Sequence, residues 1–402
     1  MATMSLGRLI AFLSVATTIT ASLHYYFWAR LVRDTALPPP WRPLGTVLIV
    51  LLAVLLPTVM VLNRVVPHSV LRFAALPAFV WMGMMLLLLL ALLTTDAVRL
   101  VAWLLEHARG EGPASPERRL LFQRALGSLA AAVAGGLTVR ALQQGLAPVA
   151  VKHVEVPLAR LPGALDGMTL VQITDVHVGG ATQDRGFIER IVQRINQLEP
   201  DIIAITGDLV DGSVEALGHA VAPLANLKAR HGVFFVTGNH EYYAGVVAWE
   251  AELSRLGIRV LRNEHVPIEH ASGHGFDLAG VDDWSSRGFA HGHGPDLARA
   301  LAGRDQSREL VLMAHQPRQI HEAAEHGVGL QLSGHTHGGQ IWPWGFMVRL
   351  QQGFLAGLEK VGGTWLYTSK GTGYWGPPMR LGADAEITRI VLRSGASRQA
   401  RG

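Results

Sequence analysis

The sequence lacks cysteine altogether and has few charged residues for its length of 402 residues. Without cysteine it can form no disulfide, no thiolate zinc site and no thiol nucleophile. Only 16% of its residues are charged, against about 25% in soluble globular domains, while 49% are hydrophobic. The formal net charge of +4 arises in residues 1–150, with 12 Arg against 5 acidic residues, while residues 151–402 are slightly acidic, so the sequence does not indicate a nucleic-acid-binding protein. This composition indicates that part of the chain lies in a membrane.

Three stretches in the N-terminal part carry no charged side chain over 21 residues or more. A helix needs roughly 20 mostly apolar residues to cross the hydrocarbon core of a bilayer. A cleaved signal peptide would account for one such stretch but not for three. We therefore predict membrane-spanning helices at residues 9–29, 43–63 and 73–95.

A fourth segment, residues 120–145, is less hydrophobic and is rich in alanine and glycine. It can span a membrane if Arg124 and Arg140 extend toward the headgroups. Residues 117–122 also resemble a twin-arginine export signal, so the segment is either an uncleaved helix or part of such a signal. The predicted organisation is a transmembrane region of about four helices at 1–149, a second domain at 150–395 and a tail at 396–402.

Arginine is unevenly distributed over the short loops that join these segments. The loops after the first and third segments carry eight arginines close to the predicted spans, and the opposite side carries four. Because positively charged loops remain in the cytoplasm, we expect the first set to be cytoplasmic. With four spans, the domain at 150–395 then lies on the outer side.

From residue 150 onward, short hydrophobic runs alternate with amphipathic stretches, which predicts an α/β layered domain. Strands are expected at residues 170–174, 202–206, 233–237, 310–314 and 330–333. Each of them runs into a turn that bears Asp, His or Asn, at residues 174–177, 207–211, 238–241, 314–315 and 334–339. Because sites in open α/β sheets form at the carboxyl ends of strands, these turns are predicted to converge.

The side chains on these turns offer carboxylate, imidazole and amide groups but no sulfur, which suits Mn, Fe or Zn. Their number exceeds the needs of one tetrahedral metal ion. A single carboxylate can bridge two cations, and Asp208 is placed for that role. Two cations ~3.5–4 Å apart can hold a phosphate and lower the pKa of a shared water. The pattern predicts a dinuclear centre for phosphate chemistry.

The ordered motifs Asp-x-His, Gly-Asp-x-x-Asp, Gly-Asn-His-Glu, a lone His after a strand, and Gly-His-x-His resemble those of the calcineurin-like metallophosphoesterases over residues 168–392. The resemblance implies a layered β-sandwich flanked by helices. It also implies two divalent metal ions and a phosphoesterase, such as a phosphodiesterase, in which metal-bound hydroxide attacks the phosphorus. His240 would act as the general acid that protonates the leaving oxygen.

The same resemblance implies a role for each metal ligand. The first metal would be held by Asp175, His177 and His337, the second by Asn239, His315 and His335, and Asp208 would bridge the two. Asp211 and Glu241 are expected to support these ligands rather than to bind metal. Arg380 either pairs with a phosphate or has a structural role.

Residues 334–340, together with the helical N-terminus, are similar to the bacterial membrane-associated phosphoesterases. Some of these hydrolyse the pyrophosphate of a nucleotide-linked diacylglucosamine. The resemblance implies a multi-pass protein of the bacterial inner membrane that acts on a phosphorylated small molecule or lipid, and the arginine distribution places its catalytic domain on the periplasmic side. The aromatic loops at 341–346 and 373–379 either cover the core or form a rim that receives an acyl chain.

Two alternatives remain open from the sequence. One is a cytoplasm-facing UDP-diacylglucosamine pyrophosphate hydrolase, and the other is a non-catalytic membrane-bound scaffold with the same fold. The sequence does not distinguish monoester, diester and pyrophosphate cleavage, because a dinuclear centre supports all three. It also leaves the oligomeric state open.

Overall fold

The computed structural model describes residues 6–62, 68–110, 115–289 and 292–395, and the chain divides into two compact units. The helical unit comprises residues 1–143 and 377–379, and the second unit comprises residues 144–376 and 380–402. The predicted tail at 396–402 lies outside the described residues.

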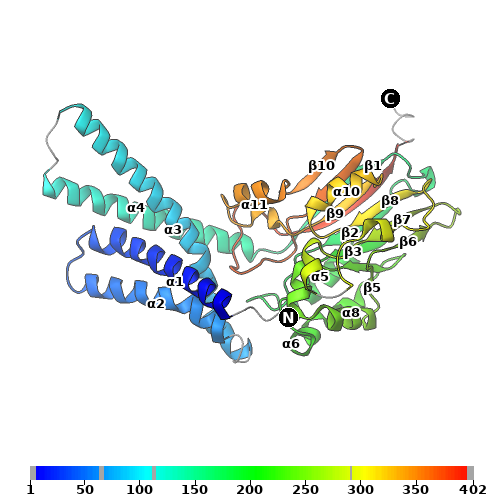
Figure 1. The fold of residues 1–402 in the computed structure, drawn as a ribbon, viewed down its shortest axis with the longest axis horizontal. Helices are drawn as coiled ribbons and strands as arrows, with labels where there is room; N and C mark the ends of the chain where they lie inside the picture. Colours follow the sequence, from blue (N-terminus) through cyan, green and yellow to red (C-terminus); the bar gives the residue numbers. More distant parts are fainter. Residues whose placement is uncertain (1–5, 63–67, 111–114, 290–291, 396–402) are drawn as a thin grey trace. The chain divides into compact units, whose positions relative to one another are not determined.

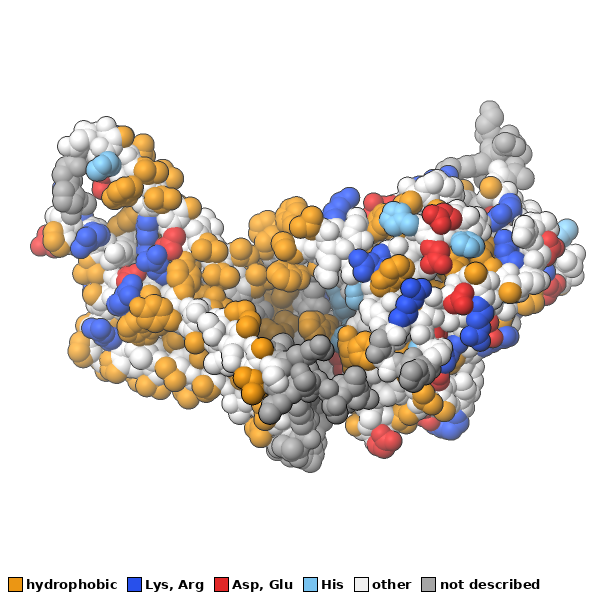
Figure 2. All heavy atoms as spheres, in the orientation of Figure 1, with side chains coloured by type: hydrophobic (Ala, Val, Ile, Leu, Met, Phe, Trp, Pro, Cys, Tyr) orange, Lys and Arg blue, Asp and Glu red, His pale blue; other side chains and the backbone are white. Residues whose placement is uncertain are grey.

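Four long helices make up the described part of the helical unit (Figure 1): α1 (Leu6–Trp28), α2 (Trp41–Leu62), α3 (His68–Ala108) and α4 (Pro116–Gly145). Over the described residues, three segments are long and apolar enough to cross a membrane, namely Trp41–Leu62, Phe73–Ala108 and Pro116–Gly145. Helix α1 is not among these three segments. Hydrophobic side chains cover most of the visible face of this unit (Figure 2).

Helix α3 continues well past the predicted segment 73–95 and ends at Ala108. At the end of the predicted segment, Asp96 pairs with Arg30, with Nη2 and Oδ2 2.9 Å apart, and accepts a hydrogen bond from Tyr26. This cluster joins the end of α1 to α3. Charged side chains at the predicted ends of the first and third segments therefore lie together.

Two six-stranded sheets form the second unit, with strand orders β1-β12-β2-β3-β4-β5 and β10-β11-β9-β8-β7-β6. The strands of the first sheet are β1 (Ala150–Leu158), β2 (Thr169–Ile173), β3 (Ile202–Thr206), β4 (Val233–Val236), β5 (Arg259–Val260) and β12 (Glu386–Ser394). Those of the second are β6 (Glu264–Glu269), β7 (Gly275–Gly280), β8 (Glu309–Met313), β9 (Leu330–Ser333), β10 (Gly357–Val361) and β11 (Thr364–Thr368).

Buried apolar side chains from both sheets pack between them, including Phe234 and Val236 from β4 and Phe276 from β7. Helices cover the outer faces (Figure 1). They are α5 (Arg185–Asn196), α6 (Val214–Val221) and α8 (Val246–Arg255) on the first sheet, and α9 (Leu297–Ala300) and α10 (Ile320–Glu325) on the second. The predicted layered β-sandwich flanked by helices is confirmed.

Helix α5 illustrates how the sequence builds a covering helix. Ile188, Ile191 and Ile195 recur at helical spacing and are buried against the sheet. Asp184 caps the helix by accepting a hydrogen bond from the N–H of Phe187. The apolar stripe and the cap together define where the helix begins and which face it buries.

Strand pairing places the predicted turns side by side. Strands β2, β3 and β4 are parallel neighbours in one sheet, and β8 and β9 are parallel neighbours in the other. These five strands match the predicted ones to within one residue at each end. Parallel pairing brings their carboxyl ends to one edge of each sheet, where the site is assembled.

Candidate metal centre

The seven predicted metal ligands lie on the turns that follow these five strands. In chain order they are Asp175 and His177 after β2, Asp208 after β3, Asn239 after β4, His315 after β8, and His335 and His337 after β9. Three groups have ligand atoms within 4.8 Å of one another: a first cluster of Asp175, His177 and His337, a second cluster of Asp208, His315 and His335, and a third group of His177, Asp211 and His240. Asn239 begins α7 (Asn239–Ala244) beside His240, whose N–H donates to Asp208 Oδ1 at 2.9 Å.

The first cluster joins the turns after β2 and β9. His337 Nε2 lies 3.3 Å from Asp175 Oδ1 and 3.1 Å from His177 Nε2. His177 Nδ1 donates to Asp211 Oδ1 at 2.9 Å, which leaves Nε2 facing His337. Asp208 Oδ2 lies 4.0 Å from the same Nε2, which places this carboxylate between the two clusters.

The second cluster brings two acceptors together. His315 Nδ1 donates to the carbonyl of Thr206 at 2.7 Å, so Nε2 carries the lone pair of the neutral ring. That Nε2 lies 3.2 Å from Asp208 Oδ2, and both atoms are buried. Two acceptors at this distance repel unless a proton or a metal ion lies with them. In the metal-free site, burial opposes protonation, but the Asp208 carboxylate raises the pKa of His315 well above its usual value.

The backbone at this site adopts an unusual conformation. Five ligands have positive φ angles between 51° and 69°, namely Asp175, His177, Asp208, His335 and His337. Residues with a Cβ rarely adopt this left-handed conformation, which costs of order 1–3 kcal/mol each and persists where the surrounding structure enforces it. Such strain clusters at functional sites because it directs side chains toward a common point.

Two glycines allow the carboxylates to approach the neighbouring turns. A Cβ on Gly238 would lie 2.2 Å from Asp208 Oδ1, and one on Gly334 would lie 2.1 Å from Asp175 Oδ2. Any larger residue would displace the carboxylates. The glycines of the motifs are therefore needed for close packing.

Asp211 and Glu241 hold the ligands in place. Asp211 Oδ1 accepts hydrogen bonds from His177 Nδ1 and from His240 Nδ1, at 2.9 and 2.7 Å. Glu241 accepts backbone N–H groups of Asp208, Leu209, Val210 and Gly238. Both therefore contact groups of the site, and their assignment as supporting residues stays a prediction.

Charges within the site shift several pKa values. Burial opposes the charge of His177, but Asp211 outweighs it and raises the pKa of His177 to about 9. Burial and the charge of His315 lower the pKa of His335 to about 3. Burial and the nearby Asp208 raise the pKa of Glu241 to about 7.

The donor set fits a pair of divalent cations. Asn239 Oδ1 and His315 Nε2 are buried without a hydrogen-bond partner. Among the described residues, no Lys or Arg forms an ion pair with Asp175, Asp208 or Asp211. Oxygen and imidazole ligands without sulfur suit Mn, Fe or Zn. Bound cations would give the unpaired acceptors their partners and would balance the buried carboxylates.

His240 lies at the accessible side of the cluster, with 17% of its side chain exposed. Its Nε2 lies 3.9 Å from Asp208 Oδ2. Tyr243 and Trp375 flank its ring, with centroids 5.5 and 6.0 Å away. Sequence reasoning placed Trp375 in an aromatic loop and missed Tyr243, although Tyr243 follows the Gly-Asn-His-Glu motif by two residues.

Arg380 has a structural role. It is fully buried, and its guanidinium donates to the backbone carbonyls of Lys370, Gly371, Gly373 and Ala383. Burial lowers the pKa of Arg380 to about 10. A further bond to the carbonyl of His337, at 3.4 Å, joins the loop after β11 to the turn that carries that residue, so Arg380 does not reach into the site as a phosphate ligand.

Comparisons with known proteins identify the class of this fold and site. A family model described as calcineurin-like phosphoesterase matches residues 168–339, which include all seven predicted ligands and His240. The chain is 40% identical over 336 residues to "Transmembrane protein with metallophosphoesterase domain" from Bos taurus, covering 81% of this chain and 74% of that protein.

A bacterial protein is similar to a comparable degree. "Uncharacterized metallophosphoesterase" from Helicobacter pylori is 41% identical over 255 residues, covering 63% of this chain and 66% of that protein. A solved dimetal phosphatase from Danio rerio covers 51% of this chain and 88% of its own, with 16% identity and a TM-score of 0.36.

The chain belongs to the calcineurin-like metallophosphoesterase family. It is therefore a metal-dependent phosphoesterase whose substrate carries a phosphate ester or anhydride. Its relatives come from animals as well as bacteria, so the resemblance reaches beyond the bacterial subgroup. Its apolar helices indicate an association with membranes.

Proposed function

We propose that this protein is a membrane-anchored two-metal phosphoesterase that hydrolyses a lipid-linked phosphoester or pyrophosphate. The observation that carries the proposal is the buried, strained set of ligands around Asp208. One Mn, Fe or Zn ion would be held by Asp175, His177 and His337, the other by Asn239, His315 and His335, with Asp208 shared between them.

Two divalent cations held by these residues would polarise a phosphate ester and lower the pKa of a bound water. His240 is the residue that handles the leaving group. Asp211 fixes the His240 ring through Nδ1 and leaves Nε2 free to donate a proton. A general acid in this position stabilises the departing oxygen as the ester bond breaks.

The surroundings of His240 favour a substrate with an apolar part. A cavity of about 330 Å³ beside His240 is lined in part by Asp211, Tyr243 and Trp375. The two aromatic residues are 53% and 54% exposed and present flat apolar faces. Such faces suit a ring or an acyl chain next to the phosphate.

A second apolar surface follows the Gly-His-x-His turn. In α11 (Gly345–Gln352), Phe346 is 71% exposed and Leu350 is 81% exposed, and Trp344 just before the helix is 52% exposed. Gln340 bonds reciprocally with the backbone of Trp375, which links this surface to the loop beside His240. An exposed apolar rim connected to the site is what a lipid-linked substrate requires.

Membrane anchoring has independent support. The alignment with the cattle relative covers 81% of this chain, which is more than residues 144–376 and 380–402 alone supply. The similarity therefore includes part of the helical unit, and that relative is named a transmembrane protein. Confinement to a membrane raises the effective concentration of a lipid substrate.

The experiment uses the purified full-length chain in lipid nanodiscs. Metal is removed with a chelator and restored as Mn, Fe or Zn, and hydrolysis of an aryl phosphodiester, an aryl phosphate and a lipid pyrophosphate is measured. We expect about two metal equivalents per chain and metal-dependent hydrolysis. Asp208→Ala is expected to abolish both, since one carboxylate serves both cations, while the exposed Asp305→Ala serves as a matched control.

Two results would contradict the proposal. Full metal occupancy in Asp208→Ala would remove the bridging role. Two bound metal equivalents without hydrolysis of any of the three substrates would favour a non-catalytic scaffold.

A further inference from the structure

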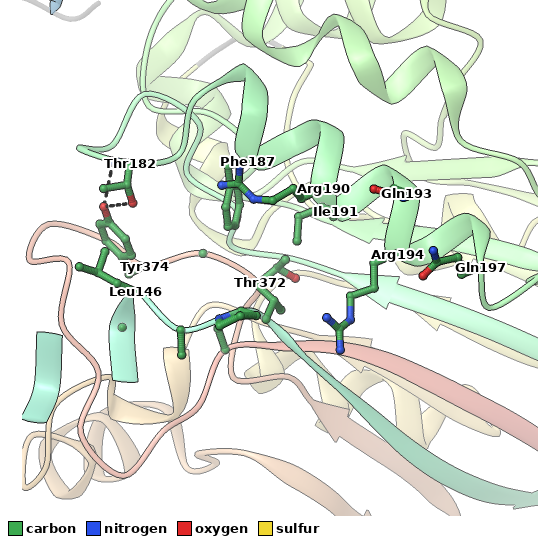
Figure 3. Close-up of a pocket in the computed structure, with 16 residues that line it drawn as sticks. Leu146, Thr182, Phe187, Arg190, Ile191, Gln193, Arg194, Gln197, Thr372 and Tyr374 are labelled. Atoms are coloured by element: carbon green, nitrogen blue, oxygen red, sulfur yellow. Dashed lines mark hydrogen bonds between the residues drawn. The ribbon is translucent and has the colours of Figure 1, made fainter. Parts of the chain in front are cut away.

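A second pocket lies within the catalytic unit, apart from the metal ligands. It has a volume of about 450 Å³, within the usual range for ligand sites. Its walls are one face of α5, residues 145–149 and the loop at 372–374 (Figure 3). None of the metal ligands lines it.

Two arginines give this pocket its charge. Arg190 and Arg194 lie one helical turn apart on α5, and the pocket lining contains no Asp or Glu. Figure 3 shows Arg194 extending away from α5 toward the strands and Arg190 lying alongside Phe187. Over the described part of the chain, neither arginine forms an ion pair, whereas Arg185 on the same helix pairs with Glu189. Two unpaired guanidinium groups over one cavity suit a phosphate.

The rest of the lining combines apolar side chains with polar ones such as Gln193 and Gln197. Leu146 is 52% exposed, and Pro148, Phe187 and Ile191 also line the cavity. A free phosphate would leave this apolar surface in contact with water. A phosphate that carries an acyl chain would use both parts of the pocket.

The position of the pocket along the chain indicates where such a molecule comes from. Residues 146–149 directly follow α4, a candidate membrane span that ends at Gly145. Four residues extend by at most ~14 Å. If α4 crosses the bilayer, its last turn lies among the headgroups, so this lining segment remains within reach of the bilayer surface.

The pocket also contacts the loop beside the metal centre. Tyr374 lines the pocket, and its hydroxyl bonds to Thr182 at 2.8 Å. The next residue, Trp375, flanks His240. The N–H groups of Thr372 and Gly373 donate to the carbonyls of Thr174 and Asp175. A ligand that packs against Tyr374 therefore restrains the loop that shapes the substrate cavity.

We propose that this pocket binds the headgroup of an anionic phospholipid, whose phosphate pairs with Arg190 and Arg194 and whose first acyl carbons pack against Leu146 and Phe187. The bound lipid holds the loop at 372–375 and thereby supports hydrolysis. Lipid binding does not depend on the proposed function, but the effect on hydrolysis does.

The experiment places the full-length protein in nanodiscs of phosphatidylcholine, with or without phosphatidylglycerol, and then counts the lipids retained after transfer to detergent by native mass spectrometry. We expect wild type to retain phosphatidylglycerol in preference to phosphatidylcholine. The double variant Arg190→Gln and Arg194→Gln should retain it about tenfold less, because it loses two charge-assisted contacts. Arg230→Gln with Arg255→Gln removes the same charge from exposed arginines outside the lining and should behave as wild type.

Further arms separate the lipid from other sources of phosphate. Inorganic phosphate is added to the protein in phosphatidylcholine nanodiscs, and we expect no binding that depends on Arg190 and Arg194. In a separate test, Leu146→Ser should weaken the retention of phosphatidylglycerol. Equal retention by the double variant and wild type, with equal Tm, would overturn the site. Arginine-dependent binding of inorganic phosphate at the affinity of the lipid would overturn the lipid assignment.

Hydrolysis of a soluble aryl phosphodiester is the second readout. We expect phosphatidylglycerol to raise turnover in wild type and in the Arg230/Arg255 control but not in the Arg190/Arg194 variant. If phosphatidylglycerol is retained through the two arginines but does not change a measurable turnover, the proposed effect of the lipid on the loop at 372–375 is wrong. If the proposed function is wrong, the wild-type protein will hydrolyse no aryl phosphodiester in nanodiscs of either lipid composition.

Discussion

At the scale of single residues, His240 is the side chain whose role can be separated from metal binding. Its ring is fixed by Asp211 and flanked by Tyr243 and Trp375, and it lies at the accessible side of the ligand cluster. The backbone N–H of His240 donates to Asp208 Oδ1, and a substitution of the side chain preserves this hydrogen bond. A variant at this position therefore tests proton transfer with the ligands intact.

His240→Ala is expected to lower turnover by ~10²–10⁴ while metal content stays near normal, since a general acid contributes on that scale. The loss should be smaller for nitrophenyl esters than for alkyl esters, because nitrophenolate leaves without needing a proton. Steady-state rates on a series of leaving groups, with metal analysis of the same preparation, provide the measurement. An equal loss across the series would remove proton donation from the role of His240.

Arg380 provides a structural test at the same scale. Arg380→Lys keeps the charge but supplies fewer donors to the buried carbonyls of the loop at 370–373 and of Ala383. Buried carbonyls left without partners cost about 1–3 kcal/mol each, so we expect Tm to fall by about 4–8 °C. Thermal unfolding followed by near-UV circular dichroism measures this, and Lys228→Arg, at another site, serves as the control. An unchanged Tm would show that the bonds are dispensable.

At the scale of elements, the strands that position the site could be predicted from the sequence. Strands β2, β3, β8 and β9 are buried on both faces, so they are nearly continuous apolar runs that end at glycine or a polar turn. The candidate ligands could be proposed from the sequence because they lie on the turns that follow these runs and β4. Local sequence therefore contained both the strand and its ligand.

Other elements could not be predicted from local patterns. Strand β1 carries Lys152, His153 and Glu155, and its strand character depends on parallel pairing with β12, more than 200 residues away in sequence. Strand β10 is a partly buried edge strand. The bonds of Asp211 to two imidazoles and of Arg380 to the carbonyl of His337 are also long-range contacts, which a single sequence does not display.

The exposed face of α11 leads to a prediction about an element. Phe346→Ser with Leu350→Ser should lower hydrolysis of a bilayer-embedded phosphodiester about tenfold or more, because each exposed apolar side chain contributes ~1.5–3 kcal/mol on burial. Hydrolysis of a soluble aryl phosphodiester should not change. The matched control is Val247→Ser, an exposed apolar residue on α8. A parallel loss on both substrates would indicate a general structural defect instead of lost lipid contact.

At the scale of the whole molecule, the topology rests on where the arginines lie. Arg30 and Asp96 pair within the helical unit, which brings together the cytoplasmic ends expected for the first and third segments. Helix α4 then starts on that side and leads into the catalytic unit. Because eight arginines lie near this side and four near the other, we propose that the catalytic unit is on the outer side.

The absence of cysteine makes this topology directly testable, because a single introduced thiol is the only one in the chain. Ser115→Cys lies just before α4, and Val247→Cys lies in the catalytic unit, and both positions are exposed. In intact cells, a membrane-impermeant maleimide should label position 247 at once and position 115 only after permeabilisation. Labelling of both on one side would mean that α4 does not cross the membrane. The reverse order would place the metal centre in the cytoplasm, where a nucleotide-linked lipid such as UDP-diacylglucosamine becomes the expected substrate.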